Sequence, residues 1–420
     1  MNTRKISVLA IAFSMSGLMN IYGQYACDKT ILESLEETAG ILKQKENTEL
    51  WGVQLSAPVI LIDHMKNKMY FTAIDNGQVE PLKEEAWDNK VPLANSYFNY
   101  NGKNHITIVY DALLHSSCED RVNLLAHEIF HSYQKGLGLP NAASMNYHMD
   151  EPVGRALLQI EIQTLRKALQ GDLQSLYDAL YVKKYRQSLY PENNEEAYEL
   201  NEGLAEYTGS KIGIKNLNDY ITKRFVYNKN VGYTNGFGYI TGAAYAYLLD
   251  DIYPGWQYDK ELIKGMTHLL AKVDPRYNIV VDSVYLNKLF LAYNYEQILA
   301  DEYKELQSFG DIASFENLLK PEAEKVVIPN NGVNFTFNPN DRVIALSDAV
   351  LLRNMTVSSE WGKVKVNSGM IRLNNWRAFY LPPPTGINGN TVKGDNYEIT
   401  LNPGWKLTKK EKQWQIVKID

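Results

Sequence analysis

The chain has 420 residues, of which 45% are hydrophobic and 22% are charged, and its formal net charge at pH 7 is −6. These proportions are those of a folded globular protein, so they exclude a disordered, collagenous or coiled-coil chain. The acidic balance also argues against nucleic acid or an anionic membrane surface as the main partner. The length predicts two or three domains of about 150 residues each.

The first residues have the order of a secretory signal peptide. Arg4 and Lys5 precede the apolar run 6–19, and small and polar residues follow as far as Gly23. We therefore predict a signal peptide over 1–23 and export to the periplasm, the cell surface or the medium. A retained membrane anchor is the alternative, but the run is shorter than the ~20 apolar residues that a membrane helix needs. No later segment predicts a membrane span.

The chain has two cysteines, Cys27 and Cys118. In an oxidising compartment they can form a disulfide, although sequence alone does not demonstrate the pairing. Cys27 also lies just behind the predicted cleavage site, which raises the alternative of lipid attachment. Bacterial lipoprotein signals usually have Leu where this chain has Gln24, so the lipoprotein is the less favoured alternative.

Residues 24–115 predict a helix followed by a small sheet. Apolar side chains recur at helical spacing over 30–45. Short β signals follow at 59–62, 69–72, 97–100 and 106–110. Asn101-Gly102 is a strong hairpin signal, because both residues tolerate a positive φ. We expect an antiparallel sheet.

Residues 116–325 predict a helical lobe. Ser117, with Asp120 three residues later, is typical of a helix N-cap, and this helix is predicted to run to Gly136. Further helices are predicted at 151–170, 172–188, 195–212, 239–252, 259–272 and 283–308. Proline, asparagine and glycine in 321–332 are typical of a linker.

Residues 326–420 alternate between apolar and polar side chains, which predicts strands of a sandwich-like β domain. The fold class is therefore predicted to be α+β, with a small N-terminal antiparallel sheet, a helical lobe and a C-terminal all-β domain.

The segment from His127 through Glu128 to His131 carries the strongest chemical signal. Four residues make about 1.1 helical turns, so both imidazoles project from one face at a separation that suits one Zn²⁺ with bonds of about 2.0–2.1 Å. Glu128 is placed to act on a water and not to bind the metal. The neighbouring residues are mostly apolar, so an unpartnered histidine pair would be costly here. The sequence predicts one zinc ion per chain.

Zinc needs a third protein ligand. A glycine at 134 and a histidine at 137 would extend the motif, but Gln134 and Leu137 occupy these positions. The better candidate is Glu202, and Glu206 lies one turn later on the same face. We predict that Glu206 accepts the outer N–H of a ligating histidine.

The residues Gly203, Leu204 and Ala205 after Glu202 are small or apolar, and Gly203 is expected to let the Glu202 helix and the histidine helix approach closely. The alternative for Glu202 is a solvent-exposed acidic residue near a helix N-terminus, with no role in metal binding. His148 is the reserve candidate, as third ligand or as oxyanion donor.

These motifs resemble those of the gluzincin metallopeptidases, whose thermolysin-like and aminopeptidase members pair a HExxH helix with a glutamate on a following helix. The resemblance covers 127–131 and 201–207, with the flanking strand 106–110. It implies a zinc peptidase with Glu128 as general base. Strand 106–110 looks like the family's edge strand, which would pair with an extended peptide substrate.

The aminopeptidase branch also has a Tyr-x-x-Gly-Ala helix start whose tyrosine stabilises the oxyanion. Tyr239 is in the matching position, with Tyr233 as second choice. Two features depart from that branch. Segment 132–201, between His131 and Glu202, is longer than the corresponding segment of that branch and is expected to contain a helical hairpin. The chain also has no upstream Gly-x-Met-Glu-Asn string, which in that branch binds the free α-amine of the substrate. The choice between endo- and exopeptidase therefore stays open.

The leading prediction is a secreted zinc metallopeptidase that acts on peptides or proteins. One alternative is a zinc hydrolase of a non-peptide amide or ester. Another is a surface binding protein with an inactive peptidase fold and a functional C-terminal β domain. The tryptophans of that domain suit sugar stacking, although core packing is their commoner use.

Overall fold

The computed structural model describes residues 27–88, 90–307, 309–338 and 340–419, and the predicted signal peptide lies outside these residues. The chain divides into two compact units. The first comprises the described residues up to Met145, with Gln159–Tyr227 and Asn235–Leu289. The second comprises Asn146–Leu158, Asn228–Thr234 and the described residues from Phe290 onward.

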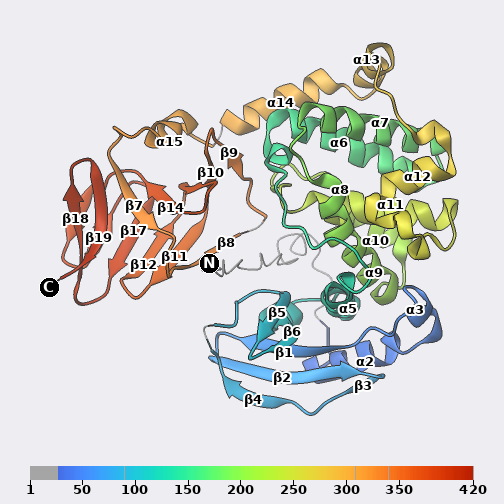
Figure 1. The fold of residues 1–420 in the computed structure, drawn as a ribbon, viewed down its shortest axis with the longest axis horizontal. Coiled ribbons are helices and arrows are strands. Elements are labelled where there is room, and N and C mark those ends of the chain that lie inside the picture. The colour runs from blue at the N-terminus through green and yellow to red at the C-terminus, as the bar shows by residue number, and fades with distance from the viewer. Residues whose placement is uncertain (1–26, 89, 308, 339, 420) are drawn as a thin grey trace, which may run out of the picture. The chain divides into compact units, whose positions relative to one another are not determined.

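The predicted α+β fold class is confirmed, with a sheet near the N-terminus, a helical region and C-terminal sheets (Figure 1). Within the described part of the chain, every helix is too short or too polar to cross a bilayer.

The sheet of the first unit has the strand order β3-β2-β1-β6-β5, and β4 pairs with β2. The strands are β1 Ala57–Asp63, β2 Lys68–Asp75, β3 Gln78–Val79, β4 Lys83–Ala86, β5 Ser96–Tyr100 and β6 Lys103–Val109. Asn101 and Gly102 have φ angles of 51° and 83° between β5 and β6, which confirms the predicted hairpin. Ile60 and Ile62 of β1 pack with Val91 on one face, while α2 and α5 contact the sheet.

Two expectations for this sheet are wrong. The sheet is mixed, because β1 and β6 are parallel from Val59↔Ile106 to Ile62↔Val109, while its other pairings are antiparallel. In addition, strand 106–110 is not an edge strand, since β6 lies between β1 and β5. Strand β6 is central because Ile106 and Ile108 are fully buried. The parallel pairing was missed because turn residues specify only the pairing within a hairpin.

The helices over the sheet begin at side-chain caps. Helix α2 (Ile31–Leu42) is capped by Thr30, and α5 (Cys118–Gln134) by Ser117, whose side chain accepts a hydrogen bond from Asp120 N at 3.1 Å. Cys27 and Cys118 form a disulfide, so the segment before α2 is joined to the first residue of α5. Two short helices, α3 (Lys45–Glu49) and α4 (Tyr110–Leu114), lie between these elements in the chain.

Most of the predicted helices are present. The α-helices that follow α5 are α6 Pro152–Ala168, α7 Leu173–Leu189, α8 Glu195–Tyr198, α9 Leu204–Gly213, α10 Leu217–Arg224, α11 Phe237–Ile252, α12 Met266–Val273, α13 Ser283–Ala292, α14 Tyr295–Gln307 and α15 Ile312–Leu318. Short 3₁₀ turns occupy Tyr147–Asp150, Trp256–Tyr258, Lys260–Lys264 and Pro275–Tyr277. Helices α6 and α7 form the expected helical hairpin, and Gly171 with φ of 97° lies in the turn between them.

Several helix predictions differ from the structure. The helix expected over 259–272 is divided at Gly265, which has a φ of 118°, into the 3₁₀ turn Lys260–Lys264 and α12. The helix expected over 195–212 contains a π-helical turn, Glu199–Gly203, between α8 and α9. The helix expected over 283–308 breaks near Asn294, which has a φ of 53°. Helix α10 was not predicted, because its eight residues are too few to show a clear apolar period.

The C-terminal strands form two sheets that share one core, as a sandwich does. One sheet has the order β18-β19-β7-β14-β13-β10-β9 and the other β15-β16-β17-β12-β11-β8. Their bounds are β7 Lys325–Pro329, β8 Asn334–Phe337, β9 Ile344–Ala345, β10 Ala349–Leu352, β11 Met355–Ser359, β12 Gly362–Val366, β13 Met370–Leu373, β14 Ala378–Leu381, β15 Gly386–Asn388, β16 Thr391–Lys393, β17 Tyr397–Leu401, β18 Trp405–Lys410 and β19 Gln413–Lys418.

Buried side chains of both sheets, such as Val326 and Val364, pack in a single cluster. The linker predicted over 321–332 is wrong, because its centre is strand β7, which pairs with β14 and β19. The sequence of a short strand that ends in proline and is followed by asparagine is similar to that of a linker, because its pairing partners are far away in the chain and leave no local signal.

A buried carboxylate joins the segments of the second unit. Asp150 accepts hydrogen bonds from the backbone N–H groups of Tyr233, Thr234 and Val343 at 2.7, 3.2 and 3.0 Å. Arg155 lies 3.2 Å from the same carboxylate and 2.6 Å from Glu302. These contacts explain why two short segments from within the helical region belong to the same unit as the C-terminal sheets.

We expect the Cys27→Ser/Cys118→Ser variant to lose about 2–4 kcal/mol of unfolding free energy, because the disulfide closes a loop of 91 residues. Denaturant unfolding under oxidising conditions measures the loss. Reductant should lower the stability of the wild type to that of the variant and leave the variant unchanged. Equal midpoints for both proteins without reductant would contradict the disulfide's role.

Candidate metal centre

Helix α5 presents His127 and His131 on one face, as predicted. The His127 side chain is 3% exposed and that of His131 is 14% exposed. The two Nε2 atoms lie 3.1 Å apart, so both rings point these nitrogens at the same spot. A helix with such a buried face needs a partner for each imidazole nitrogen.

Glu202 reaches the same spot from the π-helical turn Glu199–Gly203. Its Oε2 lies 3.6 Å from His127 Nε2 and 3.5 Å from His131 Nε2. A tetrahedral zinc ion with bonds of about 2.0–2.1 Å holds neighbouring ligand atoms about 3.3 Å apart. The three separations in this site bracket that value, so the three donor atoms are spaced to hold one metal ion.

A buried polar atom without a hydrogen-bond partner also favours a cation here. Glu202 Oε2, which faces both Nε2 atoms, is buried and has no hydrogen-bond partner among the described residues. Burial alone would lower the pKa of His127, but Glu202 and Glu206 outweigh it and raise the pKa to about 10. Burial opposes ionisation of Glu202, but the charges of the two histidines hold its pKa well below the usual range.

Glu206 lies on the outer side of His127, as predicted from its position one turn after Glu202. Its Oε2 is 3.6 Å from His127 Nδ1. Tyr220 of α10 donates a hydrogen bond to the other carboxylate oxygen, and Asn123 donates to Tyr220 Oη at 3.1 Å. These contacts orient the Glu206 carboxylate toward Nδ1, which leaves His127 Nε2 for a metal. The role of Tyr220 was missed because α10 itself was not predicted.

Gln134 performs the matching task for His131. Its Nε2 donates hydrogen bonds to the carbonyl oxygens of Leu200 and Asn201, at 3.2 and 2.6 Å. Its Oε1 lies 2.8 Å from His131 Nδ1 and therefore accepts that N–H, so Nε2 of the ring is left for a metal. Gln134 thus joins the histidine helix to the π-helical turn. Its position three residues after His131, on the same helix face, is the signal that could have revealed it.

Asn201 orients the carboxylate of Glu202. Its side-chain amide donates to Glu202 Oε1 at 2.9 Å, which leaves Oε2 directed at the histidines. Segment 201–207 was selected in the sequence for Glu202, and the orienting role of Asn201 was not predicted.

Glu128 is buried beside both histidines, and the residue is 5% exposed. Burial raises the pKa of Glu128, while the charges of His127 and His131 oppose this shift. A carboxylate whose pKa is raised is a better proton acceptor near neutral pH than an ordinary glutamate.

Tyr239 of α11 lies against the same site. Its ring stacks on that of His127, with centroids 5.5 Å apart and an interplanar angle of 3°. Burial and then the negative charge of Glu202 raise the pKa of Tyr239 well above the usual range, so the phenol keeps its proton and can donate a hydrogen bond.

The other two candidates for oxyanion donor belong to a different compact unit from the histidine pair. Tyr233 and His148 belong to segments of the second compact unit, whereas the histidine pair, Glu202 and Tyr239 belong to the first. Tyr233 Oη accepts a hydrogen bond from Asn228 N at 2.6 Å. Its hydroxyl is therefore already engaged within its own loop.

Close helix packing holds the Glu202 turn in place. A Cβ at Gly203 would lie 2.5 Å from Gly242 Cα and 2.8 Å from the carbonyl oxygen of Gly238, so the turn touches the backbone of α11. Gly203 was expected to permit close approach to the histidine helix, but the backbone that it contacts is that of α11. The contact of α9 with α5 depends on Gly209, whose Cβ would lie 2.6 Å from the carbonyl oxygen of Asn123.

Comparison of the chain with protein-family models, with curated proteins and with solved structures found no match. The interpretation of the site therefore depends on its own geometry and chemistry.

We expect purified protein to bind one Zn²⁺ per chain and His131→Ala to bind none, measured by elemental analysis after dialysis. Free zinc at 100 times its dissociation constant should stabilise the wild type by about 2.7 kcal/mol and leave His131→Ala unchanged in thermal unfolding. His115→Ala is the matched control, because the His115 side chain is 76% exposed. Zinc loss in both variants, or in neither, would contradict the assignment.

Gly203→Ala should separate the π-helical turn from α11. We expect a loss of about 1–3 kcal/mol in unfolding free energy and zinc binding weakened by about 10-fold or more. Gly40→Ala in α2 is the control, since a Cβ there meets nothing within 4 Å. That variant should gain about 0.5–1 kcal/mol and bind zinc normally. Equal stability of the two variants would refute the close-packing account.

Proposed function

We propose that this protein is a secreted zinc-dependent metallopeptidase. The observation that carries the proposal is the convergence of His127, His131 and Glu202 on one buried point, with Glu128 and Tyr239 beside it. Two histidines and a glutamate are the ligand set of one class of zinc peptidases. The resemblance of the motifs to those of gluzincins supports the same assignment.

Each residue of the site has a distinct task in this proposal. Zinc, when bound, polarises the scissile carbonyl and lowers the pKa of a water to about 7. Glu128 removes a proton from the attacking water and delivers it to the nitrogen of the leaving amine. Tyr239 donates its phenolic hydrogen to the oxygen that becomes negative as the carbonyl carbon turns tetrahedral.

One edge of the sheet is β5 and the opposite edge is formed by β3 and β4, so strand 106–110 is not an edge. Strand β5 contacts α5, which carries both histidines (Figure 1). An extended peptide can add to an unpaired edge through backbone hydrogen bonds. We therefore assign substrate pairing to Ser96–Tyr100 in place of the strand first predicted.

The disulfide supports an exported protein. Disulfides persist mainly in oxidising compartments. A cysteine sulfur that is joined to Cys118 cannot carry a lipid chain, so the disulfide also favours export without lipid attachment at Cys27.

Glu128→Gln should retain zinc and lose peptide cleavage by about 10²–10⁴-fold, because the variant keeps the shape of the side chain but cannot accept the proton. The measurement is digestion of a peptide library with zinc content determined on the same samples. Unchanged cleavage by the zinc-loaded variant would contradict the role of Glu128. Wild type that binds zinc but cleaves no peptide would favour the hydrolase of a non-peptide amide or ester.

A further inference from the structure

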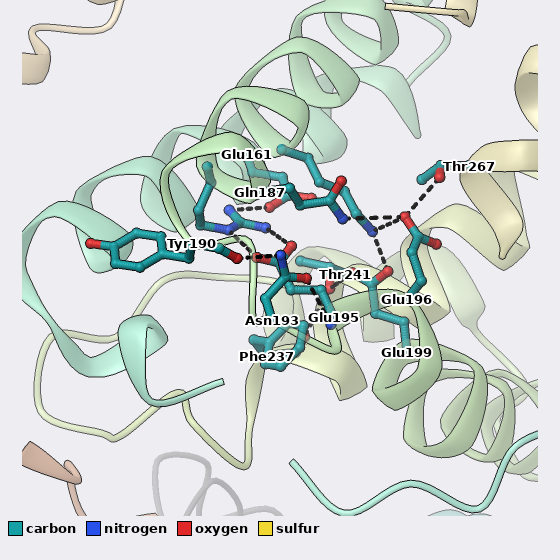
Figure 2. A network of polar contacts seen from close by, with 12 residues as sticks. Glu161, Gln187, Tyr190, Asn193, Glu195, Glu196, Glu199, Phe237, Thr241 and Thr267 are labelled. Atoms are coloured by element: carbon teal, nitrogen blue, oxygen red, sulfur yellow. Dashed lines mark hydrogen bonds and ion pairs between the residues drawn. The ribbon is translucent and has the colours of Figure 1, made fainter. Parts of the chain in front are cut away.

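A buried network of charges contacts the helical segment that leads to Glu202. Two cations of α7 lie among four carboxylates, and Figure 2 labels the four glutamates. The members are Glu161 of α6, Lys183 and Arg186 of α7, Glu195 and Glu196 of α8, and Glu199 of the π-helical turn. Except for Glu196, each of their side chains is at most 1% exposed.

The ion pairs attach α8 and the π-helical turn to α7. Lys183 Nζ forms a close ion pair with Glu199 and lies 3.1 Å from Glu196 Oε1. Arg186 contacts Glu195 at 2.9 Å, and on its other side it contacts Glu161 at 2.6 Å. Three of the four carboxylates therefore belong to residues 195–199, which are helix α8 and the first residue of the π-helical turn that contains Glu202.

Hydroxyl groups attach the same segment to two further helices. Thr241 of α11 donates to Glu199 Oε1 at 2.6 Å, and Thr267 of α12 donates to Glu196 Oε1 at 2.7 Å (Figure 2). The segment before Glu202 is thus held from α7, α11 and α12 by directional polar contacts.

The π-helical turn makes the two glutamates diverge. Side chains three residues apart lie on nearly the same face of a regular α-helix. Glu199 enters the charge network, whereas Glu202 reaches the histidines, although only three residues separate them. The wider turn places the side chains in different directions. A return to regular α-helix would pull one of the two glutamates away from its partner.

The energetics of buried ion pairs favour a role in orienting the π-helical turn over a role in stabilising the fold. A buried ion pair often stabilises a fold no more than apolar side chains of the same volume would, but its contacts are directional and permit a single arrangement. We propose that Lys183 and Glu199 are positioning residues that hold the π-helical turn in the register that directs Glu202 at the histidine pair. This inference rests on the proposed zinc site.

The test uses Lys183→Met/Glu199→Gln, which removes the ion pair without leaving one charge buried alone. We expect the full-length variant to fold, as judged by circular dichroism, and its zinc dissociation constant to rise by about 10–100-fold, the range typical of lost outer-shell partners. Competition with a chromophoric chelator measures the constant. The visible spectrum of Co²⁺ bound in place of zinc should change, because it reports the ligand set.

The control is Arg155→Met/Glu302→Gln, which removes an equally buried ion pair from the second unit and leaves Asp150 with its three backbone N–H donors. It should bind zinc as the wild type does. Wild-type affinity in the Lys183 variant, or equal weakening in both variants, would overturn the positioning role while the proposed function stands. If the Lys183 variant does not fold, Thr241→Val is the second test, because it removes the hydroxyl that donates to Glu199. Weaker zinc binding in that variant supports the positioning role of Glu199, and unchanged binding overturns it. A wild type without zinc would instead refute the proposed function, and this inference with it.

Discussion

Burial of the Glu202 carboxylate against two imidazoles is the constraint on which the rest of the first unit depends. A charge in a medium of low polarity is costly unless an opposite charge or a full set of hydrogen bonds compensates it. The facing Oε2 has no hydrogen bond from the described residues, although Asn201 satisfies the other oxygen. A divalent cation between this oxygen and the histidine nitrogens would remove the deficit, which is why the arrangement suits a metal.

The fold meets this constraint by bringing three helices close together. Helix α5 supplies the histidines, the π-helical turn supplies the carboxylate, and α11 supplies the tyrosine. Glycines at two contacts, Gly203 and Gly209, let backbones approach to distances that a Cβ would prevent. Polar contacts then set the orientation within this packing. Gln134 connects the histidine helix to the turn, and the Lys183–Glu199 pair holds the turn from α7.

Local patterns predicted much of the fold, and their failures have a common origin. The Asn101-Gly102 hairpin, the Ser117 cap and the alternation of apolar residues in the C-terminal strands depend on neighbours within a few residues, and the structure confirms them. The parallel pairing of β1 with β6, the edge position of β5 and the inclusion of 325–329 in a sheet depend on partners far away in the chain. Nothing in the local pattern specifies those partners.

The same division applies to the candidate site. The motif alone places His127 and His131 on one helix face, because four residues make about 1.1 turns whatever the surroundings. The sequence also marked Glu202 and Tyr239 as candidates. Their meeting with the histidines depends on the π-helical turn and on helix contacts between distant segments, which no local pattern specifies. The physical reason is that backbone geometry is local, whereas burial, close packing and charge compensation are properties of the folded chain.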